Sequence, residues 1–159
     1  MPTPEFIVGM REKIGHDELW LSGVTAVVSR KTDAGTEVLL GRRADNGSWT
    51  NITGIIDPGE EPAVAAEREV LEEAGIVAVA ERLVWVHALP KMAWGNGDKA
   101  QFLDIAFACR YVSGEPEPVD GENSAVAWFP IDALPALAED HAERIRVALS
   151  GEERARFER

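Results

Sequence analysis

Three glutamates, Glu69, Glu72 and Glu73, form the densest group of chemically active side chains in the sequence. They lie within residues 54–76, a segment with six glutamates and one aspartate but a single basic residue, Arg68. On a helix, side chains three and four positions apart are neighbours, and like charges at that spacing repel one another. Carboxylate oxygens are also the ligands that Mg²⁺ and Mn²⁺ prefer. Two interpretations therefore stand: a solvated acidic helix face, or a site whose bound cation offsets the repulsion.

The three glutamates need a helix to bring them together, and signals at both ends of the segment predict one. Pro62 favours a first helical turn, and Gly75 favours a helix end. At 100° per residue the apolar side chains form one arc that includes Val64 and Leu71, and the three glutamates fall in the opposite arc. The pattern predicts a buried apolar face and an exposed acidic face, with Glu67 as an acidic residue inside the apolar arc.

The loop before this helix is built from turn-forming residues. Gly54 and Gly59 predict a tight turn, and glycine permits a close approach of the backbone to a ligand. Glu60 follows the turn, in a position either to cap the helix or to face the acidic cluster. The loop therefore favours the cation interpretation.

The loop and the helix together match a known pattern. With five residues between the first two positions and seven between the next two, the matched residues are Gly54, Glu60, Arg68, Glu69, Val70, Glu72, Glu73, Gly75 and Ile76. Every fixed position of the Nudix box is present, so the chain resembles the Nudix hydrolase family, which includes MutT-like proteins. The resemblance implies an α/β fold, an α/β/α sandwich with a mixed sheet, in which the box forms loop, helix and loop. It also implies a Mg²⁺ or Mn²⁺ cofactor.

The resemblance further implies roles for the box residues. Glu69 and Glu73 would be the main metal ligands, with Glu72 close beside them. Arg68 would hold a box glutamate in place by a charge-assisted pair. The backbone carbonyl of Gly54, or of Thr53 before it, would lie near the metal. Two more residues would support the metal shell and its turn: Glu60 and Gly59.

Two places outside the box supply further candidates. The family often takes another acidic residue from a late loop as metal ligand or general base, and Glu122 fits that place, with Asp120 as second choice. Arg42 and Arg43 end a predicted strand where some relatives use an arginine on substrate phosphate, and Arg42 is preferred. The alternative for each of these residues is an ordinary polar surface position.

The loop at residues 90–101 is a candidate lip for the substrate. Trp94 would stack on a base, and Lys91 and Asn96 would bind its polar edges. The alternative for Trp94 is packing within the protein, which is the commoner use of tryptophan.

A chain of 159 residues suits a single domain, residues 1–159. Apolar periodicity predicts an N-terminal helix at about residues 4–15 and a C-terminal helix at about residues 139–159. The predicted strands, of which the first two form a hairpin, are residues 23–29, 36–43, 83–89, 102–112 and 125–129.

Charge and composition limit the classes of partner that the protein can bind. The net charge of −12 argues against stable binding of long nucleic acids, because such a field repels polyanions. A small phosphorylated substrate is compatible when a cation bridges it to the protein. The single cysteine, Cys109, permits no disulfide within the chain, and no apolar run approaches the ~20 residues of a membrane span. We expect a soluble cytoplasmic protein, with the N-terminal helix as a surface for a homodimer.

The leading functional prediction is a metal-dependent pyrophosphohydrolase. It would cleave the diphosphate bond of a nucleoside diphosphate linked to another moiety, by attack of water at phosphorus. Two substrate classes remain open: nucleoside triphosphates, including oxidised ones, and ADP-ribose with other nucleotide sugars. The alternative is a non-catalytic Nudix-like module that senses a nucleotide. The intact box glutamates favour the enzyme, because sensing modules tend to lose them.

Overall fold

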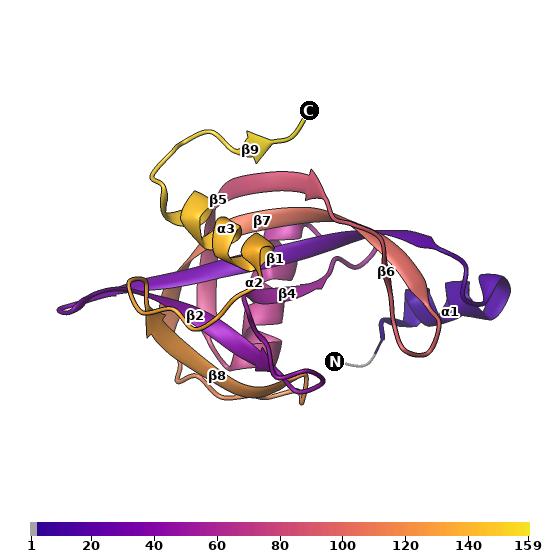
Figure 1. Ribbon diagram of the computed structural model, residues 1–159, viewed down its shortest axis with the longest axis horizontal. Coiled ribbons are helices and arrows are strands. Elements are labelled where there is room, and N and C mark those ends of the chain that lie inside the picture. The colour runs from indigo at the N-terminus through magenta and orange to yellow at the C-terminus, as the bar shows by residue number, and fades with distance from the viewer. Residues whose placement is uncertain (1–2) are drawn as a thin grey trace.

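The computed structural model describes residues 3–159 and consists of three helices and a mixed sheet (Figure 1). In chain order the elements are α1 (Glu5–Ile14), β1 (Leu19–Thr32), β2 (Gly35–Arg43), β3 (Trp49–Thr50), β4 (Ile52–Ile55), α2 (Pro62–Ala74), β5 (Val77–Ala88), β6 (Met92–Ala93), β7 (Lys99–Ser113), β8 (Asn123–Pro130), α3 (Glu139–Leu149) and β9 (Arg156–Phe157). The predicted strands and the predicted box helix are all present, so the expected α/β class is confirmed.

The sheet is built around the long pair β1 and β7. These two strands run parallel, in register from Leu19 opposite Ala100 to Ser29 opposite Arg110. The main strand order is β3-β2-β1-β7-β5-β9, with β4 paired to β1, β6 to β7 and β8 to β2. The β1–β2 hairpin is antiparallel, as predicted, so the sheet is mixed.

Helices α2 and α3 cover opposite faces of this sheet. Successive residues of a strand point to opposite faces, so β1 contributes side chains to the interfaces with both helices. Val24 and Ala26 of β1 pack in the cluster that contains the buried side of α2. Val27 packs instead with Ile145 of α3. Figure 1 shows the two helices on either side of the central strands. The architecture is the predicted α/β/α sandwich. Cys109 is buried in the α2 cluster, as expected for an inert thiol.

The predicted burial of α2 is wrong in one respect. Val64 and Leu71 are about half exposed, at 55% and 51%, whereas Glu69 and Glu73 are only 1% and 5% exposed. The face of α2 that packs on the sheet is made of small residues such as Ala66, and it continues into the two glutamates. The acidic cluster is therefore partly buried rather than solvated.

Glu67, the acidic residue within the apolar arc, has a structural explanation. Its Oε1 accepts a hydrogen bond from the backbone N–H of Ala80, at 2.9 Å. The pairing of β5 with β7 shifts register between Ala80 and Arg82, where the regular ladder is interrupted. Glu67 thus satisfies a backbone donor at an irregularity of the sheet.

The C-terminal helix is shorter than the predicted range of about 139–159. Helix α3 ends at Leu149, and Gly151 follows with a left-handed φ of 76°. Glycine adopts this conformation without steric cost and commonly ends helices. The chain then turns back, and Arg156–Phe157 forms the short strand β9 beside β5.

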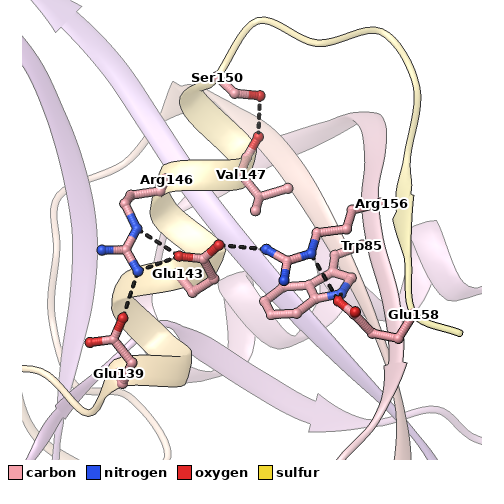
Figure 2. Close-up of polar contacts among 8 residues, drawn as sticks. All are labelled: Trp85, Glu139, Glu143, Arg146, Val147, Ser150, Arg156 and Glu158. Carbon is pink, nitrogen blue, oxygen red and sulfur yellow. Dashed lines mark hydrogen bonds and ion pairs between the residues drawn. The ribbon is translucent and has the colours of Figure 1, made fainter.

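Figure 2 shows how this C-terminal segment is held against α3 and β5. The guanidinium of Arg156 lies 4.3 Å from the centre of the Trp85 ring and donates to Glu143 of α3 at 2.5 Å. Glu158 accepts hydrogen bonds from the Trp85 indole N–H, at 3.1 Å, and from Arg156, at 2.9 Å. A cation–π contact and polar contacts therefore replace the continued helix.

The N-terminal helix matches its prediction. Helix α1 follows Pro4 and ends at Gly15, whose φ is 60°. Its buried residue Ile7 packs against Leu21 and Phe102 of the same chain. The homodimer through this helix stays a prediction. Within the described residues, no helix combines the length and the apolar character needed to cross a membrane.

Candidate metal and phosphate site

The backbone of β4 lies directly against the first buried glutamate of α2. Gly54 pairs with Val24 of β1, and a Cβ atom on Gly54 would lie only 2.0 Å from Cδ of Glu69. No other residue type leaves room for that carboxylate. Glycine at this position therefore serves a close approach of backbone and side chain.

Arg68 connects the loop of the box with its helix. Its Nε and Nη2 donate to the two carboxylate oxygens of Glu60, at 2.8 and 2.9 Å. Its Nη1 donates to Glu69 at 2.8 Å and to Glu72 at 3.1 Å, and its Nη2 also reaches the carbonyl oxygen of Ile55 at 3.2 Å. Hydrogen bonding to Glu60 is the main cause of the raised pKa of Arg68, and the same bond lowers the pKa of Glu60.

Burial raises the pKa values of the two buried glutamates of α2, Glu69 and Glu73. The pKa of Glu69 rises to about 7, chiefly because burial disfavours its charged form, although Arg68 opposes the rise. The pKa of Glu73 rises to about 8, again through burial and then through the nearby charge of Glu122. Oε2 of Glu69 is buried and has no hydrogen-bond partner within residues 3–159. A buried carboxylate oxygen in this state is costly unless a cation or a proton satisfies it.

These side chains suit a hard divalent cation. The available donors are carboxylate and carbonyl oxygens, which Mg²⁺ and Mn²⁺ prefer, and the unpartnered oxygen of Glu69 lies among them. Within the described residues, no group of three or more histidine, cysteine, aspartate or glutamate side chains is arranged to hold a metal ion as it stands. Arg68 holds oxygens of Glu69 and Glu72. An open site of this kind fits Mg²⁺, which usually keeps water and takes substrate phosphate as ligands.

The start of β8 brings two more residues to Glu73. Glu122 raises the pKa of Glu73, so its charge lies close to that carboxylate. Its backbone is fixed by Asp120, which accepts a hydrogen bond from the Glu122 N–H at 3.0 Å. Next to it, Asn123 donates from Nδ2 to Oε2 of Glu73 at 2.9 Å. Sequence reasoning reached Glu122 and missed Asn123, because nothing local to residue 123 indicates a partner 50 positions away.

Arg42 and Arg43 lie at the rim of a cavity of about 770 Å³ between the β2–β3 turn and the segment that leads into α3. Arg43 pairs with Asp45 at 2.6 and 2.9 Å, which is the main reason that its pKa is raised. Arg42 donates to the carbonyl oxygen of Gly47 at 3.1 Å. Glu122 and Glu73 are among the charges that act on Arg43, but neither is among the residues described as lining the cavity.

His141 lines the same cavity, and sequence analysis did not single it out. The backbone N–H of Asn51 donates to Nδ1 of His141, at 3.3 Å. A backbone N–H can only donate, so Nδ1 carries no proton and the proton of the neutral ring lies on Nε2. Burial lowers the pKa of His141 to about 4, which keeps the ring neutral. His141 therefore offers the cavity a hydrogen-bond donor rather than a charge.

The three residues predicted at the substrate lip lie on the β6–β7 hairpin. Lys91 pairs with Glu18 at 3.0 Å, and Asn96 donates to Asp98 at 3.0 Å. Trp94 packs edge-to-face on Phe102, with ring centres 6.4 Å apart. In the described chain, these residues are not among those that line the cavity beside the arginines. Their contact with a substrate stays a prediction.

The buried glutamates predict a specific pH dependence for the stability of the cation-free protein. Between pH 6.5 and 8.5, Glu73 loses its proton in the folded state, while in the unfolded state it is already ionised. The unfolded state then binds fewer protons, so stability falls as pH rises. For a pKa of about 8 the loss from Glu73 alone is about 2 kcal/mol, or roughly 4–8 °C in Tm for a chain of this size. Glu69, with a pKa of about 7, changes stability in the same direction. His141 acts in the opposite sense only below about pH 6.5, outside this window.

Calorimetry in EDTA across pH 6.5–8.5 measures this slope. Adding millimolar Mg²⁺ at pH 8.5 is expected to restore Tm, because metal binding favours the deprotonated carboxylates. The same addition at pH 6.5 is expected to have a smaller effect. A Tm that rises through this window in EDTA would contradict the burial of these two charges.

The sandwich carries buried glutamates on helix α2, with a glycine-containing loop before that helix. The model of the NUDIX domain matches residues 21–149, and the chain belongs to the NUDIX family. A MutT-like protein of Streptomyces ambofaciens is 32% identical over 111 residues, which cover 69% of this chain and 66% of that protein. The NAD-capped RNA hydrolase NudC of Chromobacterium violaceum is 31% identical over 105 residues, 65% of this chain and 37% of that protein. The chain thus spans less than two thirds of the length of these relatives.

Solved structures agree on the fold. A UDP-X diphosphatase superposes with a TM-score of 0.66 at 22% identity, covering 96% of this chain and 73% of that chain. A NUDIX hydrolase from Nitrosomonas europaea superposes with a TM-score of 0.64 at 25% identity, covering 86% and 93%. The likeness extends over the whole sandwich rather than over the box alone.

Proposed function

We propose that the protein is a divalent-cation-dependent pyrophosphohydrolase that cleaves the diphosphate bond of a nucleoside diphosphate linked to another moiety. The observation that carries the proposal is the buried pair Glu69 and Glu73, with one carboxylate oxygen unpartnered, in a member of the NUDIX family. A buried carboxylate oxygen without a partner is costly unless a cation or a proton satisfies it, which supports a bound cation in the working enzyme. Mg²⁺ or Mn²⁺ is the proposed cofactor.

Each residue of the site then has a defined task. Glu69 and Glu73 hold the cation, with Glu72 and Glu122 at its margin, and Arg68 keeps Glu69 in place from its pair with the loop. When bound, the cation stabilises charge on the phosphate oxygens and lowers the pKa of an attacking water. Glu122 is the proposed general base, because its charge acts on Glu73 and so lies close to the proposed metal ligands.

The cavity supports a substrate with a phosphate chain and a nucleoside. Arg42 and Arg43 at its rim can bind phosphate oxygens, and His141 can donate to a carbonyl or phosphate oxygen. The names of the relatives include NAD-capped RNA hydrolase and RNA pyrophosphohydrolase, and those of the structures include ADP-ribose pyrophosphatase. These substrates share a nucleoside diphosphate. The net charge of −12 favours the small members of this group over long RNA.

A substrate panel tests the proposal. The protein is incubated in the presence of Mg²⁺ with one substrate at a time: ADP-ribose, NAD, nucleotide sugars, dNTPs or 8-oxo-dGTP. The monophosphate and pyrophosphate released in each reaction are measured. Turnover in ¹⁸O-labelled water then identifies the phosphorus that is attacked. We expect turnover of at least one class that depends on the cation and is lost in EDTA. Nucleotide binding without turnover of any class would favour the sensing module instead.

A further inference from the structure

Asn123, the first residue of β8, points toward α2 only because the strand is irregular there. Val126 and Trp128 of β8 pack in the α2 cluster, so regular alternation would turn Asn123, three positions before Val126, to the other face. The pairing of β8 with β2 contains a register shift at this point, which leaves Ser124 as an extra residue. A bulge of this kind re-aims a side chain. Asn123 is consequently 6% exposed, whereas Ser124 is exposed.

The neighbouring strand leaves space for the Asn123 side chain. Gly41 of β2 pairs with Val126, and a Cβ atom on Gly41 would lie 2.6 Å from Oδ1 of Asn123. The φ angle of Gly41 is not positive, so its conformation is open to other residues. Glycine is needed at this position for space. The bulge and Gly41 together leave a space that the carboxamide of Asn123 fills.

This carboxamide holds the glutamate that Arg68 does not reach. Nδ2 of Asn123 donates to Oε2 of Glu73 at 2.9 Å, and both side chains are buried. Glu69 and Glu72 are held by a cation, Arg68, which offsets part of their charge. An amide is neutral and orients Glu73 without offsetting its charge. Asn123 therefore orients Glu73 without placing a positive charge beside it.

The same residue connects two parts of the site. Asn123 directly follows Glu122, whose backbone carbonyl accepts a hydrogen bond from the N–H of Ala44 at 2.8 Å. One side-chain hydrogen bond thus links the late segment that carries Glu122 to helix α2.

We infer that Asn123 is a positioning residue: it orients Glu73 toward a divalent cation and fixes the segment that carries Glu122 beside that glutamate. The inference rests on the proposed function, because it assigns a partner to one of the proposed metal ligands. Partners that orient metal ligands typically contribute tenfold to a hundredfold to metal affinity.

Mn²⁺ binding in the absence of substrate tests the inference. Asn123→Ala is expected to raise the Kd for Mn²⁺, measured by calorimetric titration at pH 8, by about tenfold or more. Gly41→Ala, which displaces the carboxamide without removing it, is expected to change the Kd in the same direction by less. Thr25→Val is the matched control, since Thr25 is a buried residue with one side-chain hydrogen bond, to Asp104, on the face of α3. Its Kd for Mn²⁺ is expected to equal that of the wild type, although its Tm falls.

The possible outcomes separate the inference from the function. A wild-type protein that binds Mn²⁺ and turns over substrate, with Asn123→Ala binding Mn²⁺ within twofold of it, overturns the inference alone. A wild-type protein that neither binds Mn²⁺ nor hydrolyses any substrate overturns the proposed function and the inference with it. If Asn123→Ala does not fold, Gly41→Ala decides: an unchanged Kd overturns the inference, and a raised Kd supports it.

Discussion

Glu73→Gln is expected to lower kcat/KM by roughly 10³-fold while the protein stays folded. The substitution keeps the shape of the side chain and can keep a hydrogen bond with Asn123, but it removes a charge that would face the cation. Loss of several kcal/mol of charge stabilisation at a metal site corresponds to about this factor, because each 1.36 kcal/mol is tenfold. Steady-state kinetics on the best substrate of the panel, at saturating Mg²⁺, measure the loss. Without cation, Tm at pH 8.5 is expected to rise, since a buried charge is removed.

Glu67→Gln is the matched control for that substitution. Glu67 lies on the same helix, and a glutamine carbonyl can still accept the hydrogen bond from the Ala80 N–H. Its kcat/KM is expected to stay within about twofold of the wild type. Near-wild-type rates in Glu73→Gln would show that Glu73 is not part of the catalytic site. The burial of its carboxylate would then have no functional explanation.

Gly54→Ala is expected to have the second largest effect. A methyl group at this position would collide with Cδ of Glu69 at 2.0 Å, and both partners are enclosed by β1 and α2. Overpacking of this kind costs about 1–3 kcal/mol, or roughly 2–12 °C in Tm. Displacing Glu69 by about 1 Å is expected to lower kcat/KM by about 10²-fold. Thermal denaturation and kinetics of the purified variant measure the two effects separately.

Gly9→Ala serves as its control, because a Cβ atom on Gly9 meets nothing within 4 Å. Gly9 lies inside α1, where alanine is expected to stabilise the helix by about 0.5–1 kcal/mol. An active, stable Gly54→Ala variant would mean that β4 and Glu69 can move apart, and the close approach would then not be required.

Most of the elements could be predicted from the sequence because their signals are local. Pro62 and Gly75 bracket α2 as expected, and the β-rich runs became strands of one sheet. The burial of α2 was predicted wrongly for a physical reason. Pattern reasoning places charge outward, and this helix instead buries Glu69 and Glu73 while exposing Leu71. Local rules fail most readily where a site works against the stability of the fold.

The candidate site was predictable where the box fixes the spacing and unpredictable where the partner is distant. The contacts of Arg68 with Glu60 and Glu69 lie within eight positions of each other in the chain. Asn123 pairs with Glu73, 50 residues away, and His141 is held by Asn51, 90 residues away. Such pairings depend on strand order and on a bulge, which no short window of sequence encodes. The end of α3 was also misjudged, because the tail gains its contacts with Trp85 only once β5 is in place.

The parallel pairing of β1 and β7 also sets the order of events during synthesis. Leu19 and its partner Ala100 are about 80 residues apart, so a ribosome adding about 5–20 residues per second needs roughly 4–16 s between them. Residues 54–76 are complete 24 residues before Ala100, so for about 1–5 s of that interval the whole box exists while α2 lacks the finished sheet on which its glutamates are buried. Contacts across such separations form slowly because the intervening loop must first be closed. The acidic motif therefore begins as a solvated segment, and Glu69 and Glu73 become buried only when the centre of the sheet closes.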